Sequence, residues 1–168
     1  FNLNYGKGGI FMDKTVIALF NRREDAEQAA NELRNQNFPI ENISIAVKES
    51  DNNEKQEELV DDDITDGITA GGVLGGIAGL LIGAGTFAIP GLGLLTAAGP
   101  LAGLLSGAVT GGIVGGLIDL GIPETKTSLY EEGLKEGKIL MTTKVKAENI
   151  NQVMNILKKY GGNEIESY

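Results

Sequence analysis

The chain has 168 residues, with no Cys and no His, and its 23 acidic and 14 basic residues give a formal net charge of −9. This length suits one domain, or one domain with an insertion. The missing thiols and imidazoles exclude disulfides, Cys nucleophiles, His-based triads and the usual zinc sites. The negative charge argues against nucleic acid as a partner. We therefore expect no enzyme, and we assign no catalytic, cofactor-binding or metal-binding residue.

The first eleven residues precede Met12 and read FNLNYGKGGIF. Codons for Lys7, Gly8 and Gly9 can form a purine-rich ribosome-binding sequence a few nucleotides before an ATG. We therefore expect translation to start at Met12, which makes residues 1–11 a non-native leader that takes no part in the fold. The alternative is a genuine, disordered extension.

Residues 12–47 are predicted to form the first β-α-β half of a small domain. The run 15–20 (TVIALF) is short, apolar and rich in β-branched residues, which indicates a buried strand. Asn21 is expected to cap a helix, and Asn37 and Pro39 to end it. One apolar face of that helix is predicted from the spacing of Ala26, Ala29, Ala30 and Leu33. A second strand is predicted over 43–47.

Residues 119–168 are predicted to repeat this pattern after a helix that follows Pro123. Strands are expected over 138–145 and 164–168, and Gly161 with Gly162 marks the end of the helix between them. The apolar face of this helix is predicted to contain Ile150, Val153, Met154, Leu157 and Tyr160. The two halves together predict an α+β fold: a ferredoxin-like split β-α-β sandwich, with a four-stranded antiparallel sheet and two helices on one face.

Residues 48–66 are polar and strongly acidic, which is typical of a solvated linker. The four aspartates Asp61, Asp62, Asp63 and Asp66 raise the possibility of a metal site. Their spacing does not match a calcium-binding loop, so a solvated acidic flank is the better interpretation.

Residues 67–118 contain no charged residue and hold 17 of the 25 glycines. Most of these glycines recur every fourth position, which places them in one row on a helix. Pro90 and Gly91 form a turn signal between two apolar arms, and Gly99 with Pro100 is a second break. We therefore predict an inserted glycine-zipper α-helical hairpin, in which the helix-packing residues are Gly67, Gly71, Gly75, Gly79, Gly83, Gly99, Gly103, Gly107, Gly111 and Gly115.

Glycine in a helix costs about 1 kcal/mol relative to Ala, so ten of them need close packing to offset the loss. Each predicted arm exceeds the roughly 20 apolar residues of a membrane span. Membrane association through residues 67–118, with the α/β domain in the cytoplasm, is therefore one expectation. Burial of the hairpin between the subunits of a soluble oligomer is the alternative, and both favour self-association.

Two other motifs carry weaker signals. The glycine-rich runs lack the strand, lysine and acidic partner of a nucleotide-binding loop. Tyr130, Glu131 and Glu132 could form an acid site, but a solvated helix face is the simpler interpretation.

The residues after the hairpin resemble a known family. Gly121-Ile122-Pro123-Glu124, Tyr130-Glu131-Glu132-Gly133, Lys135, Gly137 and the strand Lys138 to Val145 are similar to bacterial general stress proteins. This is the heat-induced stress-protein domain of Bacillus-type bacteria, which is related to low-temperature-induced proteins. The opening strand and the helix start from Asn21 to Glu27 also fit. The resemblance implies stress-linked expression and no established enzymatic activity.

Three functional hypotheses follow. The chain is a membrane-associated stress protein, a soluble oligomeric one, or a small-ligand sensor of the kind that ferredoxin-like domains often form.

Overall fold

The computed structural model describes residues 13–49, 85–89, 92–107 and 112–168. The predicted leader 1–11, residues 50–66 of the acidic linker, and the zipper glycines from Gly67 to Gly83 lie outside these ranges.

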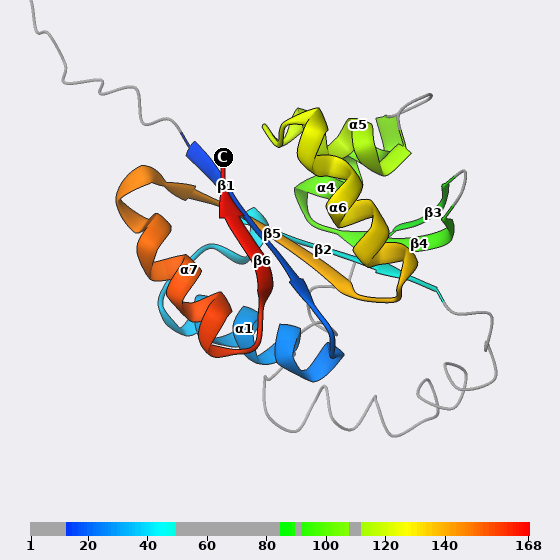
Figure 1. The fold of residues 1–168 in the computed structure, drawn as a ribbon. Coiled ribbons are helices and arrows are strands. Elements are labelled where there is room, and N and C mark those ends of the chain that lie inside the picture. Colours follow the sequence, from blue (N-terminus) through cyan, green and yellow to red (C-terminus); the bar gives the residue numbers. More distant parts are fainter. Residues whose placement is uncertain (1–12, 50–84, 90–91, 108–111) are drawn as a thin grey trace, which may run out of the picture.

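Six antiparallel strands form one sheet, with helices on both of its faces (Figure 1). The elements are β1 (Asp13–Phe20), α1 (Arg23–Asn35), β2 (Ile43–Lys48), β3 (Gly85–Ile89), β4 (Gly93–Ala98), α4 (Pro100–Gly107), α5 (Gly112–Asp119), α6 (Glu124–Lys135), β5 (Ile139–Lys146), α7 (Ile150–Lys159) and β6 (Asn163–Ser167), with short 3-10 turns at Ile40–Asn42 and Ala147–Asn149. This confirms the α+β class.

The strand order is β3-β4-β2-β5-β1-β6. The four strands predicted from the sequence are β1, β2, β5 and β6. They are adjacent in the sheet, in the spatial order β2-β5-β1-β6. β5 pairs with both β1 and β2, so a third strand splits the β1-α1-β2 unit. The additional strands β3 and β4 extend the sheet beyond β2.

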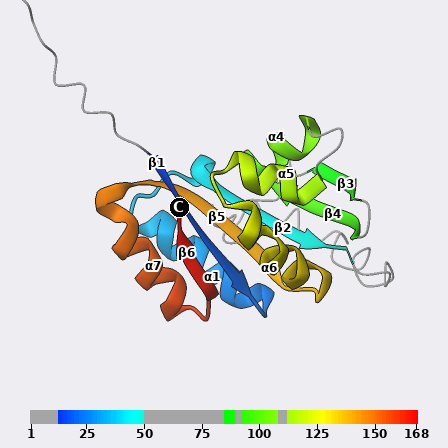
Figure 2. The same cartoon turned by 45° about the horizontal axis from the view of Figure 1, so that its top comes forward.

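Helices α1 and α7 cover one face of the sheet, as Figures 1 and 2 show. The predicted apolar face of α1 is buried, and α7 buries Val153, Ile156 and Leu157 in the same cluster. The strands contribute alternate residues to it, including Val16, Ala18 and Phe20 from β1. The helix start differs from the prediction, because α1 begins at Arg23 with Arg22 as its N-cap and no side-chain cap.

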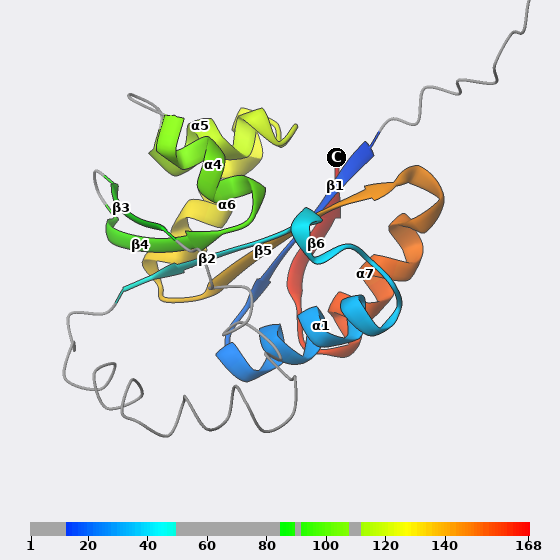
Figure 3. The same ribbon diagram turned by 180° about the vertical axis from the view of Figure 1, so that it is seen from behind.

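The opposite face of the sheet is covered by α4, α5 and α6, seen from behind in Figure 3. The intervening strand residues, including Ile17, Leu19, Ala46 and Leu140, point into this second cluster. The expected pair of helices on one face is therefore present as α1 and α7, and the cover of the opposite face was not predicted. Both sides of the central strands are apolar, and the glycine-rich segment supplies much of the second cover.

The predicted long helical arms are not present in the described part of residues 67–118. Gly85–Ile89 and Gly93–Ala98 form the paired strands β3 and β4, and Pro100–Gly107 and Gly112–Asp119 form two helices of 8 residues each. The predicted turn at Pro90 and Gly91 lies outside the described residues, and the described segments before and after it are strands rather than helices. The four-residue glycine row is interrupted here by Phe87 and Leu95, and β4 satisfies the open edge of β2.

Candidate functional site

The second-arm zipper glycines occupy three different environments. Gly99 precedes α4 with a φ of +80°, and a Cβ there would lie 2.1 Å from the carbonyl oxygen of Ile43. Beside it, the N–H of Leu101 donates a 3.0 Å hydrogen bond to Ser44 Oγ. Gly99 is therefore a turn residue pressed against β2, which corrects its prediction as a helix-packing residue.

Gly103 and Gly115 lie in α4 and α5, and a Cβ at either position would meet nothing within 4 Å. Gly107 ends α4, and Gly111 lies outside the described residues. Within one chain, the glycine at the α4–α5 contact is Gly116, where a Cβ would lie 3.2 Å from Leu101 and 3.4 Å from Leu105. Packing of Gly103 and Gly115 against another molecule stays a prediction.

The strands β3 and β4 and the helices α4 and α5 lie together at one side of the molecule (Figures 1 and 3). The described residues from 85 to 118 carry no charge, and we call their surface the charge-free end. Two of the molecule's exposed large apolar side chains belong to it: Leu94 is 49% exposed and Ile118 is 42% exposed. Charged groups border it, since the Thr96 hydroxyl donates a 2.6 Å hydrogen bond to the Glu49 carboxylate and exposed Asp119 follows Ile118. The exposed apolar side chains and the low density of charge make this end a candidate interaction surface.

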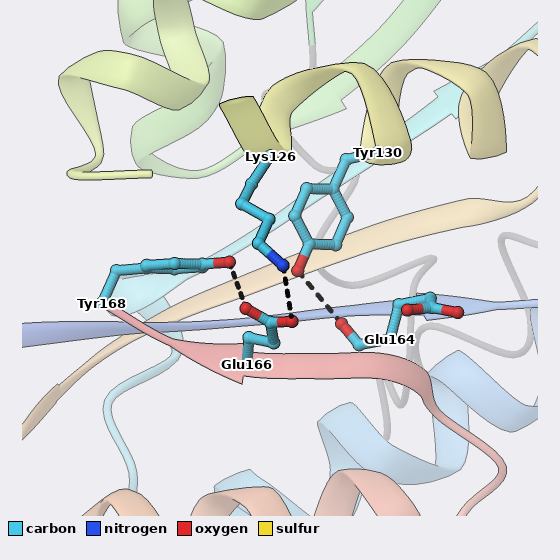
Figure 4. Close-up of polar contacts among 5 residues, drawn as sticks. All are labelled: Lys126, Tyr130, Glu164, Glu166 and Tyr168. Atoms are coloured by element: carbon cyan, nitrogen blue, oxygen red, sulfur yellow. Dashed lines mark hydrogen bonds and ion pairs between the residues drawn. The ribbon is translucent and has the colours of Figure 1, made fainter. Parts of the chain in front are cut away.

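A polar cluster joins α6 to β6 on the same face of the sheet (Figure 4). Tyr130 of α6 is fully buried, and its hydroxyl donates a 3.1 Å hydrogen bond to the backbone carbonyl of Glu164. The Tyr168 hydroxyl donates to the carboxylate of Glu166, which also lies 3.5 Å from the ammonium of Lys126. The expectation that Tyr130 belongs to a solvated helix face was wrong.

The electrostatics of this cluster favour a structural role. Burial raises the pKa of Tyr130 far above its ordinary value, and burial together with the Glu166 contact raises that of Tyr168. The hydrogen bond from Tyr168, assisted by the Lys126 ammonium, lowers the pKa of the Glu166 carboxyl. Both hydroxyls therefore stay protonated and Glu166 stays ionised near neutral pH, so the cluster lacks a group poised for proton transfer.

An open groove runs between α7 and β6 and encloses about 430 Å³. Its lining combines Met154 and Ile165 with Asn151, Asn155, Lys158, Gly162 and Glu164. Oppositely charged groups, amides and apolar side chains are the components of a small polar-ligand site.

Two further observations concern only the described ranges. No helix there is long and apolar enough to cross a bilayer. Among the same residues, no group of three or more acidic side chains is placed to hold a metal ion.

Comparison with known families gave one match. The model for the heat induced stress protein YflT domain matches residues 15–99, which run from β1 to the end of β4. The chain belongs to this family of stress proteins, which is not a known enzyme family. The sequence-based assignment is thus confirmed, although the quoted residues from Gly121 onward lie beyond the matched range. No curated protein and no solved structure matched the chain.

Proposed function

We propose that this protein is a non-enzymatic general stress protein that acts by self-association through its charge-free end. The observation that carries the proposal is the distribution of charge. A chain with a net charge of −9 repels its own copies, and the described residues from 85 to 118 add no charge of their own to that repulsion, with Glu49 bordering them at Thr96. The exposed side chains of Leu94 and Ile118 give this surface apolar area to bury.

The described half of the glycine-rich segment also bears on how it associates. Its apolar side chains Leu101, Leu105, Ile113 and Leu117 pack on the sheet of the same chain. Association would therefore use the outer surface of this layer, and these four side chains would stay packed on the sheet of their own chain.

Sedimentation velocity at micromolar concentration tests this proposal. We expect the wild-type chain to sediment as a species larger than the 17.7 kDa monomer. Leu94→Glu should shift it toward the monomer, because it adds a negative charge to the charge-free end of an already acidic chain. Ile40→Glu is the matched control, because Ile40 is also exposed, at 37%. It lies before the start of β2, whereas Lys48, at the end of β2, pairs with Leu95 next to Leu94. A monomeric wild-type chain would refute the proposal.

Membrane association is a second candidate, supported by the same charge-free end and by the uncharged sequence 67–84. Flotation with neutral phosphatidylcholine vesicles tests it, since anionic lipid would repel the acidic chain. Comigration of the wild type but not of Leu94→Glu would support it, and a wild type that stays at the bottom of the gradient would exclude it.

Ligand sensing through the α7–β6 groove is a third candidate, supported by Lys158 and Glu164 in its lining. A thermal-shift screen of zwitterionic metabolites should then show stabilisation that Lys158→Ala removes. Equal shifts in both proteins would count against the groove.

A further inference from the structure

The two edges of the six-stranded sheet differ in their protection. β6 carries Glu164 and Glu166, and its register with β1 shifts between Ile17 and Leu19. Charges and bulges of this kind prevent an edge strand from pairing with another chain. β3 has the sequence GTFAI, without charge or proline, and pairs with β4 in unbroken register.

Alternate residues of an edge strand direct their backbone N–H and C=O groups away from the sheet. In the described part of the chain, no strand lies on the outer side of β3. These groups need water or another strand as a hydrogen-bonding partner. We propose that β3 pairs antiparallel with β3 of a second copy of this chain, which joins two six-stranded sheets into one.

A second copy fits this edge for reasons of symmetry and charge. An antiparallel pair of identical strands has a two-fold axis, so one patch serves both partners. The approach also places the charge-free ends together and leaves the acidic surfaces apart. Ala88 is exposed and lies opposite the exposed Leu94 in the β3–β4 register, so Ala88 would gain a neighbour from the partner's β3 while Leu94 stays one strand further from it.

This inference rests on the proposed self-association and names its geometry. Its test exploits the absence of cysteine from the chain, because any introduced cysteine is unique. We place the two-fold axis beside Ala88, where the two copies of residue 88 would form a directly opposed pair with Cβ atoms about 5 Å apart. The two copies of residue 94 would be separated by three strand spacings, about 14 Å. A disulfide requires Cα atoms within roughly 7 Å.

We expect mild oxidation of the Ala88→Cys protein to give a disulfide-linked dimer at micromolar concentration. Leu94→Cys is the matched control, since it has an exposed thiol on the same surface and should give little dimer. Circular dichroism verifies that both variants are folded. As a second variant, Ala88→Lys should sediment as a monomer where the wild type sediments as a larger species, because the substitution places two like charges beside the two-fold axis.

The outcomes separate this inference from the proposed function. A wild type that self-associates while Ala88→Cys fails to cross-link and Ala88→Lys still assembles would overturn the β3 pairing alone. Equal cross-linking of Ala88→Cys and Leu94→Cys would also overturn it, because random collision of exposed thiols would then explain both dimers. A monomeric wild type would overturn both proposals.

Discussion

The hydroxyl of Tyr130 lies 3.1 Å from the backbone carbonyl oxygen of Glu164 and ties α6 to the edge strand β6. Glu164 adopts a φ of +49°, which side chains other than glycine rarely do. The register with β1 shifts at the same place, so β6 bulges there. The bulge brings a carbonyl to the hydroxyl of the fully buried Tyr130, and the hydrogen bond between them offsets the strain at Glu164.

Tyr130→Phe should lower the free energy of unfolding by about 1 kcal/mol, since the Glu164 carbonyl loses its partner without any change in packing volume. In a chain of this size the melting temperature should fall by about 2–4 °C. Tyr160→Phe is the control, because the Tyr160 hydroxyl lies 3.5 Å from Glu32 in a partly buried contact. Equal stability of Tyr130→Phe and the wild type would show that the hydrogen bond contributes nothing.

Gly133→Ala should destabilise the fold, although alanine favours helices. A Cβ at Gly133 would lie 2.5 Å from Leu19 Cδ1, and Leu19 is only 2% exposed. Overpacking of this kind costs about 1–3 kcal/mol, which exceeds the gain in helix propensity of about 1 kcal/mol. Gly103→Ala meets nothing within 4 Å and should stabilise α4. Urea unfolding of the pair would contradict the packing if both changes had the same sign.

Gly99→Ala and Gly93→Ala separate two effects of a positive φ. The φ angle is +85° at Gly93 and +80° at Gly99. A Cβ would meet nothing within 4 Å at Gly93, but at Gly99 it would lie 2.1 Å from the Ile43 carbonyl oxygen. Gly93→Ala should cost only the conformational strain of about 1–2 kcal/mol. Gly99→Ala should cost more, because α4 must also move away from β2. Thermal unfolding that ranks the two variants in the reverse order would refute this account.

Glu166→Gln should change the acid dependence of stability. The folded-state pKa of Glu166 is lowered from its ordinary value of 4.5. The unfolded chain therefore binds the proton more readily, and the carboxylate contributes stability that is present above about pH 4.5 and lost as the pH falls through the folded pKa.

The wild type should accordingly lose its advantage over Glu166→Gln as the pH drops from 6 to about 3. Denaturant unfolding at several pH values measures this difference. Glu132→Gln removes a carboxylate from the exposed side of α6 and serves as the charge-matched control. A constant difference across the range would contradict the role of the Tyr168 and Lys126 contacts.

The sequence predicted four of the six strands and the two helices α1 and α7, because these elements follow simple periodicities. The spacing of Ala26, Ala29, Ala30 and Leu33 identifies one helix face, and the run 15–20 identifies a buried strand. That run also held an unused signal. Since Ile17 and Leu19 are as apolar as their neighbours, β1 needed cover on both faces, which implies a second helical layer.

The glycine-rich segment was harder to interpret because glycines at every fourth position predict a helix along the whole segment that they span. Phe87, Thr96 and the Pro90-Gly91 turn favoured a hairpin locally, but the decisive partner was the open edge of β2, which only the tertiary structure supplies. The Tyr130 cluster was missed for a similar reason. The hydrogen-bonded residues Tyr130 and Glu164 are 34 positions apart in the sequence, and no local pattern connects them.

The placement of β1 has a consequence for how the chain is made. β1 is the first described strand, yet both of its hydrogen-bonded neighbours, β5 and β6, lie at the far end of the sequence. During synthesis, β1 must wait until residues 139–167 have left the ribosome. The apolar surfaces of β1, β2 and the glycine-rich segment emerge before those partners, so the nascent chain passes through an interval in which chaperone binding and aggregation compete with folding.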